Sequence, residues 1–415
     1  MEIKSDIVVI GAGPVGTALS YIAAKNGNNV LIVDRKNEIA SPLRGGEAVS
    51  KFLFEELCCK LPLEGVYRWP IEDTLIYTPI SKIRTYEDKW KSFILDRKEV
   101  ENKLTQEALN AGSKLMLGAT VYDLSLSKKG ITEIKAKTLN GKLIIKPKIV
   151  VGADGATSTV RRKLLGNEIY SGIKDWGCAI EFDATNVNFD YKNTMQLFMG
   201  EIVGGYGYIF PKGENMADIG AGTRPFYGKN PLLEKSPLES FYKMIETNSV
   251  MNRQLKNFSP LRIKGGIIDL SRPIDPVYGN TILVGDAANQ NFAYVGEGIV
   301  PGWQAAIIAA QTINKALEED SLKLLSKYPV EYESTFIGQE ARKTVRIKDN
   351  ISKVIAMDIN PKIKSILTAM LETEIIKWDG KELKTALTYK DPKKLIEYAK
   401  NLIHKKQLKI EIDTR

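Results

Sequence analysis

The sequence is poor in histidine and cysteine. Its 415 residues include one histidine, His404, and three cysteines, Cys58, Cys59 and Cys178. An odd number of cysteines without C-x-x-C spacing argues against a disulfide framework and against a metal site. The adjacent Cys58 and Cys59 fit either two packed residues on one helix or a redox pair. A lone histidine near the C-terminus argues against Ser-His-Asp triads and multi-histidine metal sites, so any acid–base chemistry is expected from Tyr, Lys, Asp, Glu or a bound cofactor.

Long apolar runs are also missing. The strongest candidate, residues 298–313, is interrupted by Pro301, Gln304 and Gln311, and a bilayer span needs roughly 20 residues. The first residues lead directly into a strand pattern, which predicts that there is no signal peptide. We therefore expect a cytoplasmic protein.

Charge is unevenly distributed along the chain. Most of the net charge of +9 lies in residues 321–415. A basic end suits an anionic membrane surface, an acidic protein partner or a phosphorylated substrate, and a solvated helical surface explains it equally well. Nucleic acid is not expected, because no basic run is interleaved with glycine or aromatic residues. Peripheral contact with the inner face of the membrane is an expectation from this charge.

The hydrophobic pattern predicts two or three compact units. Strands and helices alternate at first, then strands dominate from residue 176 to about 268 with one helix, and amphipathic helices follow residue 319 almost to the end. The expected elements are strands at 6–10, 29–33, 149–151 and 281–284, helices at 14–26, 51–59, 97–111, 238–248 and 301–317, and a β-meander over 114–149.

A glycine-rich motif follows the first expected strand. It reads Gly11-Ala-Gly13-Pro14-Val15-Gly16, opens a helix, and is followed by Asp34 at the end of the next strand. In such β-α-β units the first glycine makes the tight turn, the second admits a pyrophosphate and the third allows close helix packing. The helix N-terminus offers N–H groups to the phosphates, and Asp34 is placed to accept hydrogen bonds from a ribose.

A second motif, about 270 residues later, distinguishes FAD from NAD. It consists of Gly285-Asp286 after an apolar strand, and Gly296-Glu-Gly298-Ile299 at the start of a helix. It resembles the flavin-specific Gly-Asp motif, whose acidic residue bonds the ribityl and pyrophosphate region. The following helix N-terminus then favours an anionic reduced flavin. The chain is thus predicted to be an FAD-dependent oxidoreductase.

A third segment, Asp154-Gly155, resembles the Asp-Gly fingerprint of flavoproteins with the p-hydroxybenzoate hydroxylase-like fold, and Leu95-Asp96-Arg97 completes the order of that superfamily. The resemblance implies an α/β (α+β) fold with a Rossmann-type FAD-binding domain, an inserted antiparallel-sheet substrate domain and a C-terminal helical region. The expected boundaries are 1–67, 95–175 and 266–320 for FAD binding, 68–94 and 176–265 for substrate binding, and 321–415 for the helical domain. Arg35, Arg97, Val121, Asp154 and Gly155 are expected at the cofactor.

Within that superfamily the chain resembles the archaeal geranylgeranyl reductases, which saturate isoprenoid chains of ether lipids. The similarity rests on Arg44-Gly45-Gly46-Glu47 and on residues 205–212, which are similar to the family's Tyr-x-Trp-x-Phe-Pro motif lining the lipid pocket. Tyr208 stands where the family has Trp, and Gly45 and Gly46 lie where relatives carry a cysteine. Arg44, Gly45, Gly46 and Glu47 are expected to touch the flavin or the substrate head group.

Tyr206, Tyr208 and Phe210 alternate along one expected strand, and Pro211 follows. Period two places the three rings on one face. The residues alone leave a cofactor-side wall and ordinary core packing equally open, whereas the resemblance favours a substrate pocket. It implies substrate contacts for Tyr206, Tyr208, Phe210 and Pro211, with Tyr206, Tyr208 or bound water as the proton donor.

The predicted function is reduction of carbon–carbon double bonds of a geranylgeranyl lipid by hydride from reduced FAD. A monooxygenase or quinone reductase on the same fold, and a non-catalytic flavin or lipid carrier, remain as alternatives. FAD is expected to bind without a covalent link, because no motif places a residue for one. No second G-x-G-x-x-G follows a strand, so the electron donor is either NAD(P)H or an external protein such as ferredoxin.

Overall fold

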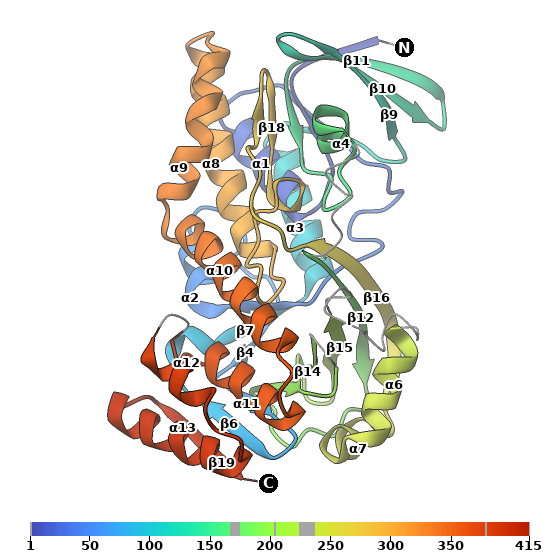
Figure 1. Cartoon of the computed structure of the whole chain (residues 1–415). Helices are drawn as coiled ribbons and strands as arrows, with labels where there is room; N and C mark the ends of the chain where they lie inside the picture. Colours follow the sequence, from blue (N-terminus) through green and yellow to red (C-terminus); the bar gives the residue numbers. More distant parts are fainter. Residues whose placement is uncertain (1, 167–174, 203–204, 224–236, 378–379, 415) are drawn as a thin grey trace.

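The computed structural model describes residues 2–166, 175–202, 205–223, 237–377 and 380–414. A first sheet occupies the upper half of Figure 1, with strand order β17-β18-β11-β1-β2-β8 and with β9 and β10 extending from β11. Its described strands are β1 (Glu2–Ile10), β2 (Val30–Val33), β8 (Lys114–Met116), β9 (Thr120–Ser127), β10 (Gly130–Thr138), β11 (Gly141–Gly152), β17 (Val277–Tyr278) and β18 (Thr281–Leu283).

The centre of this sheet is parallel and buried on both faces. In β1, Ile7 and Val9 pack against one core, and Val8 and Ile10 pack against another, as alternation along a strand requires. Helices cover the first face, and the β9–β11 meander covers the second. The helices are α1 (Pro14–Lys25), α3 (Arg97–Asn110) and α8 (Ile299–Glu318), with α4 (Thr159–Leu165) beside the meander.

The strand expected at 149–151 is the end of the longer β11. The first part of β11 pairs antiparallel with β10, and its second part pairs parallel with β1 and β18. One strand therefore belongs both to the meander and to the parallel sheet. The turn at Asn140-Gly141, which the sequence predicted, separates β10 from β11.

A second sheet lies below the first and has the order β16-β12-β15-β14-β13-β5-β6-β19. Its described strands are β5 (Asp73–Tyr77), β6 (Ser81–Thr85), β12 (Trp176–Thr185), β13 (Thr194–Met199), β14 (Gly205–Pro211), β15 (Ala217–Thr223), β16 (Ser259–Asp269) and β19 (Ile410–Thr414). A small third sheet joins β3 (Ala48–Ser50), β7 (Ser92–Leu95) and β4 (Arg68–Ile71), next to α2 (Lys51–Cys58).

Two helices rather than the single expected one pack on the second sheet, α6 (Pro237–Thr247) and α7 (Ser249–Leu255). The break falls at Asn248, whose side chain accepts hydrogen bonds from the backbone N–H groups of Val250 and Met251 and so caps α7. Phe241 of α6 stacks on Phe182 of β12 with ring centroids 5.0 Å apart.

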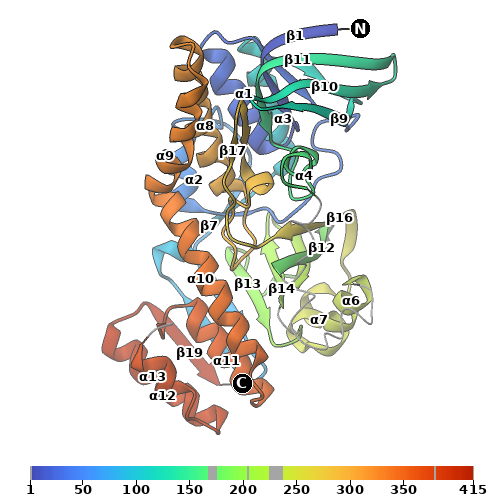
Figure 2. The same cartoon turned by 45° about the horizontal axis from the view of Figure 1, so that its top comes forward.

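The C-terminal helices connect the two sheets. They are α9 (Tyr328–Ser334), α10 (Phe336–Ala356), α11 (Pro361–Glu372), α12 (Lys381–Ala386) and α13 (Pro392–Lys406). Figures 1 and 2 show α9 and α10 running from the first sheet towards the second. Ile366 and Met370 of α11 share a core with Ile76 and Ile83 of the second sheet. No described helix is long and apolar enough to cross a bilayer.

The chain does not end in helix, because β19 pairs with β6 at the edge of the second sheet. The observed layers otherwise confirm the predicted class, a mixed α/β fold with a parallel dinucleotide-type sheet, an antiparallel-rich second sheet and a C-terminal helical region. The proposed domain boundaries keep their status as a prediction, and β19 ties the C-terminal region to the second sheet.

Candidate active site

One large cavity lies where the two sheets and the C-terminal helices meet. Its volume is about 1610 Å³, and its wall includes Gly11 of the glycine-rich loop, Tyr206 of β14 and Ile351 of α10. Ligand pockets usually measure about 300 to 1,000 Å³. This cavity therefore has room for more than one small molecule.

The glycine-rich loop forms one end of the cavity. Gly11, Gly13, Pro14 and Val15 line it, whereas Gly16 does not. A Cβ on Gly16 would lie 2.0 Å from the carbonyl oxygen of Gly11, and a Cβ on Gly13 would meet no atom within 4 Å. Gly16 thus closes the loop against the helix, while Gly13 leaves open space. Gly13 is also the N-cap of α1 and provides no side-chain cap, so the first N–H groups of α1 remain available for an anion.

Asp34 follows β2 and reaches the same end of the cavity. Its Oδ2 accepts a hydrogen bond from the N–H of Ala12 at 2.6 Å, and its Oδ1 accepts one from the N–H of Lys36 at 2.7 Å. A carboxylate has about four acceptor positions, so both oxygens retain capacity for ligand hydroxyls. Asp34 holds the loop in place and is available to a ribose, and its neighbour Arg35 also lines the cavity.

The Asp154-Gly155 segment lines the cavity together with Val121. Oδ2 of Asp154 accepts hydrogen bonds from the N–H groups of Thr159 at 2.7 Å and Val160 at 3.3 Å, in the first turn of α4. The carboxylate therefore orients the turn after β11, as the sequence predicted for a residue that connects this turn to the cofactor region.

The second flavin-type motif lies at the N-terminus of α8. Asp286, Gly296, Gly298 and Ile299 line the cavity, and the Oδ1 atom of Asp286 is buried without a hydrogen-bond partner among the described residues. Burial raises the pKa of Asp286 to about 6, and the charge of Arg97 opposes the rise. Gly285 does not line the cavity.

Gly285 instead fits closely against α1. A Cβ there would lie 3.1 Å from a methyl carbon of Val15. Its place in the motif is explained by packing between the two segments that carry the fingerprints.

Glu297 lies between Gly296 and Gly298 of this motif, and the sequence predicted no role for it. It lines the cavity, and its buried Oε1 has no hydrogen-bond partner among the described residues. Burial raises the pKa of Glu297 to about 8. A hydrogen bond from the backbone N–H of Val300 stabilises the ionised carboxylate and opposes this rise. An acidic residue between two glycines at the start of a helix is the signal that could have identified it.

The aromatic residues of β14 form a wall of the cavity. Tyr206, Tyr208 and Phe210 all line it, with ring centroids 6.2 Å apart for the first pair and 4.2 Å for the second. The three rings lie on the same face of the strand, as their alternation along the sequence predicted. The Tyr206 hydroxyl donates to the carbonyl oxygen of Val295 at 3.1 Å. Pro211 ends the strand and is not part of the cavity wall.

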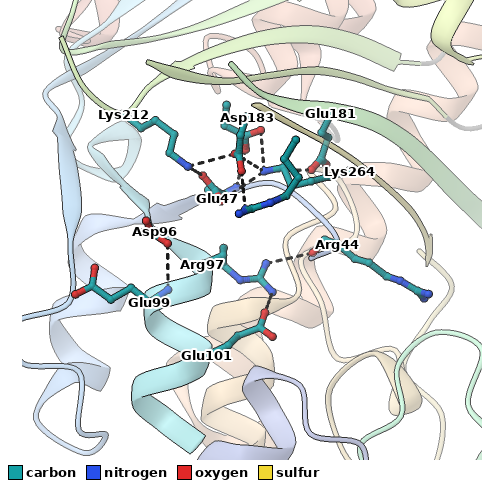
Figure 3. Close-up of polar contacts among 12 residues, drawn as sticks. Arg44, Glu47, Asp96, Arg97, Glu99, Glu101, Glu181, Asp183, Lys212 and Lys264 are labelled. Carbon is teal, nitrogen blue, oxygen red and sulfur yellow. Dashed lines mark hydrogen bonds and ion pairs between the residues drawn. The ribbon is translucent and has the colours of Figure 1, made fainter. Parts of the chain in front are cut away.

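Arg44, Gly45 and Gly46 also line the cavity, next to Arg97. Arg97 is 6% exposed; its Nη1 donates to the carbonyl oxygen of Arg44 at 3.3 Å and its Nη2 pairs with Glu101 at 2.5 Å (Figure 3). Arg97 therefore fixes the loop that carries Arg44, and its own charge lies close to the cavity.

The structure corrects the expectation for Glu47. This residue is 1% exposed and is not part of the cavity wall. Its carboxylate forms an ion pair with Lys212 and lies 3.5 Å from Nζ of Lys264 (Figure 3). A buried carboxylate is stable in its ionised form only when a cation is paired with it. For Glu47 the cations are Lys212 and Lys264, which are far from it in the sequence.

Sequence reasoning missed the whole group of charged residues around Glu47. Its other members are Glu181, Asp183, Lys212, Asp218, Arg262 and Lys264. Charged residues two apart within an apolar strand pattern, such as Glu181 and Asp183, were the available signal.

These residues fit FAD. A dinucleotide needs a glycine-rich loop at a helix N-terminus, an acidic residue after the second strand and further polar groups near the flavin. Gly13, Asp34 and the free oxygen of Asp286 supply these features around one cavity. In the described part of the chain, no three His, Cys, Asp or Glu side chains are grouped to hold a metal ion.

The chain is similar to digeranylgeranylglycerophospholipid reductases of methanogenic archaea. Digeranylgeranylglycerophospholipid reductase from Methanocaldococcus jannaschii is 32% identical over 335 residues, which are 77% of this chain and 80% of that protein. Digeranylgeranylglycerophospholipid reductase 1 from Methanothermobacter thermautotrophicus is 27% identical over 412 residues, 96% of this chain and 99% of that protein. No family model matches.

Solved structures share the fold. A geranylgeranyl bacteriochlorophyll reductase-like protein from Thermoplasma acidophilum superposes with a TM-score of 0.78 at 22% identity, covering 97% of this chain and all of that one. A halogenase in complex with FAD superposes with a TM-score of 0.67 at 14% identity, covering 94% of this chain and 85% of that one. Since the first reductase is more than 30% identical over most of both chains, this chain belongs to the digeranylgeranylglycerophospholipid reductase family of FAD-dependent oxidoreductases.

Proposed function

We propose that this chain saturates the carbon–carbon double bonds of geranylgeranyl chains in an ether-lipid precursor. The observation that carries the proposal is the single cavity that joins a dinucleotide-binding loop to an apolar region between β13, β14, α10 and α11. β13 and α10 line that region with apolar side chains, which are Met195, Leu197, Met199, Ile347, Ile351 and Ile355.

At the polar end, Asp34 binds the ribose and the first turn of α1 binds the pyrophosphate, for which Gly13 leaves room. Asp286 and the N-terminus of α8 bind the flavin portion. Bound FAD supplies the two-electron carrier from which hydride is delivered to the substrate.

At the apolar end, the wall of Tyr206, Tyr208 and Phe210 holds the prenyl chain beside the cofactor and excludes water. Burying each CH₂ group stabilises the complex by about 0.8 kcal/mol, so a chain of this length needs an enclosed apolar path to leave its membrane. Positioning and exclusion of water are the main contributions of the protein.

The lipid enters through an opening near Phe52 and Phe336. Both rings line the cavity, and they are 61% and 55% exposed. Large apolar side chains at the mouth of a lipid-binding cavity suit insertion into the membrane interface. These two exposed rings support a peripheral membrane contact at this part of the cavity wall.

The test uses FAD-loaded protein that has been photoreduced without oxygen and then mixed with a geranylgeranyl lipid. We expect the flavin to be reoxidised and the lipid to gain two hydrogens per double bond, measured by absorbance and mass spectrometry. The fully saturated lipid is the control and leaves the flavin reduced. Reoxidation that requires oxygen would indicate a monooxygenase, and tight lipid binding without reoxidation would indicate a carrier; either result contradicts the proposal.

A further inference from the structure

A cluster of buried charged residues lies directly behind the aromatic wall. Lys264 is 2% exposed, and its Nζ lies 3.1 Å from Asp218, 3.2 Å from Asp183, 3.5 Å from Glu47 and 3.9 Å from Glu181. Figure 3 shows Lys264 and Lys212 pointing into the group of carboxylates. Nothing in FAD binding or in lipid binding requires such a cluster.

Strand register places the cluster in line with the proposed substrate wall. Lys264 of β16 is opposite Glu181 of β12, Glu181 is opposite Gly220 of β15, and Gly220 is opposite Tyr208 of β14. These four residues form one row across four neighbouring strands. Directly opposite residues have their Cβ atoms about 5 Å apart, so the row brings Tyr208 within two strands of Glu181.

The next row on the same face is also charged. Arg262, Asp183, Asp218 and Phe210 are opposite one another, each two residues from its counterpart in the first row. Residues two apart along a strand point to the same face. The two rows together make up one charged patch that ends at the aromatic wall.

Gly220 opens the connection between the two sides. A Cβ at this position would lie 2.7 Å from the hydroxyl oxygen of Tyr208. The missing side chain lets the phenol lie across β15 on the side of Glu181. Burial raises the pKa of Tyr208, and the charge of Glu181 adds to the rise. The Tyr208 hydroxyl and Oε2 of Glu181 are both buried without a hydrogen-bond partner among the described residues. Tyr208 and Glu181 both line the cavity, so the pair is in reach of a bound substrate.

The charges of the cluster do not balance when every group is ionised. Four carboxylates, on Glu47, Glu181, Asp183 and Asp218, face the cations of Lys212, Lys264 and Arg262. An excess negative charge in a buried site is relieved by binding a proton.

Three of the four carboxylates have raised pKa values, in agreement with a bound proton, whereas the charges of Lys264 and Lys212 outweigh burial and lower the pKa of Asp183. Burial raises the pKa of Asp218 to about 6 and also raises the pKa of Glu181 and of Glu47, and the charge of Lys264 opposes each rise. The charge of Arg97 also opposes the rise at Glu181, but Arg97 is paired with Glu101 and so does not cancel the excess negative charge of the cluster.

The cluster also reaches solvent. Oδ1 of Asp183 is 3.2 Å from Lys264, and its Oδ2 is 2.8 Å from Nη1 of Arg262, whose side chain is 42% exposed. The cluster therefore meets bulk water at this edge of the sheet.

We propose that Glu181 and the charged cluster behind it supply the proton that Tyr208 gives to the substrate double bond. The inference rests on the proposed function. One carbon receives a hydride from the reduced cofactor, and the other receives the phenol proton of Tyr208. The phenolate takes a proton from Glu181, which is reprotonated by water that reaches the cluster, while Lys264, Asp183 and Arg262 hold the charges in place. Two electrons and two hydrogens are thus added to the substrate, and no further reactant is needed.

The first test detects the bound proton without turnover. Infrared difference spectra of FAD-bound, oxidised protein at neutral pH compare wild type with Glu181→Gln. Removing one carboxylate leaves three, which the three cations balance, so we expect one neutral-carboxyl band to be lost. Glu214→Gln is the matched control, because Glu214 has a side chain 75% exposed at the β14–β15 turn, and it should lose no such band. If the spectrum of Glu181→Gln has lost no neutral-carboxyl band relative to wild type, the proposal is overturned.

The second test follows single-turnover reoxidation of photoreduced enzyme by a geranylgeranyl lipid. We expect Glu181→Gln and the smaller change Tyr208→Phe each to slow reoxidation about 100-fold, the lower end for loss of a general acid, while FAD affinity is unchanged. The wild-type rate should fall as pH rises, because the donor must be protonated, and the rate of Glu181→Gln should not depend on pH. Glu181→Asp should restore part of the rate.

The outcomes separate the two hypotheses. If lipid does not reoxidise the wild-type flavin, the proposed function fails, and the infrared result alone decides whether the cluster holds a proton. If wild type is active and both variants match its rate and pH profile, the proton path is refuted and the proposed function stands.

Discussion

At the scale of single residues, the cavity wall contains two buried acids whose pKa values are raised. Asp286 and Glu297 both have buried oxygens without hydrogen-bond partners among the described residues, and burial raises the pKa of each. Their neutral forms can donate a hydrogen bond to a flavin, whereas their ionised forms would repel an anionic reduced flavin. The burial of these acids also makes the stability of the folded protein depend on pH.

We predict that Glu297 makes the protein less stable as pH rises. Its pKa is about 8 in the folded state and 4.5 in the reference state, so the folded protein binds more protons between these values and stability declines with increasing pH across that window. Glu297→Gln should flatten this decline, measured as the unfolding midpoint temperature from pH 5 to 9. A variant with the wild-type slope would contradict the assignment, and Glu214→Gln should keep that slope.

A second residue-scale prediction concerns Asp34. Asp34→Ala removes an acceptor from the ribose and also releases the N–H of Ala12, and we expect FAD binding to weaken by about 1.5 to 3 kcal/mol. Titration of FAD by quenching of its fluorescence measures the change. Asp6→Asn is the control, because Asp6 pairs with Lys148 at the protein surface. Equal affinity in both variants would show that Asp34 is not a cofactor ligand.

At the scale of elements, α10 and α11 determine how far the apolar part of the cavity extends. Ile351 of α10 is buried and lines the cavity together with Ile355, Ser365 and Thr368. In the proposed function, the end of a long prenyl chain that is remote from the reacting bond lies among these residues. Substrate length is therefore set by helices outside the FAD-binding sheet.

We predict that Ile351→Trp slows reduction of a geranylgeranyl lipid at least 10-fold but affects a short prenyl substrate much less. The added volume occupies space that only a long chain needs, although overpacking also costs about 1 to 3 kcal/mol of stability. Rates for both substrates and the unfolding temperature should be measured together. Ile351→Val serves as the control for the position. An equal loss for both substrates would argue against the placement of the chain.

At the scale of the whole molecule, the C-terminal region is part of the folded body. Its last strand, β19, pairs with β6, and residues of α11 share a core with the second sheet. Deleting residues 321–415 would expose that core, so truncation cannot test membrane binding cleanly. Substitutions of exposed residues at the cavity wall can test membrane binding without exposing that core.

We predict that the double variant Phe52→Ser and Phe336→Ser binds anionic vesicles at least 5-fold more weakly than wild type, because both exposed rings would insert into the interface. Val330→Ser is the matched control, since Val330 is 71% exposed on α9 and does not line the cavity. Binding should also weaken with added salt, which screens charges beyond about 8 Å at physiological strength. Co-sedimentation that is indifferent to the double variant and to salt would refute the membrane contact.

Local sequence predicted the residues that line the polar end of the cavity. The glycine-rich loop, Asp34, Asp286 and the start of α8 are defined by short motifs, because tight turns and helix N-termini depend on neighbouring residues. The alternation of Tyr206, Tyr208 and Phe210 was readable for the same reason. These features, and the fold class that they imply, came from the sequence alone.

Only the tertiary structure decided which charged residues meet. Glu47 and Lys212 are 165 positions apart, and the row from Lys264 to Tyr208 depends on the register of four strands. Strand pairing between distant segments is set by packing of the whole sheet, and no local pattern encodes it. For that reason the sequence predicted a ligand contact for Glu47, whereas the fold buries it among lysines, and it showed a helical tail where β19 completes the second sheet.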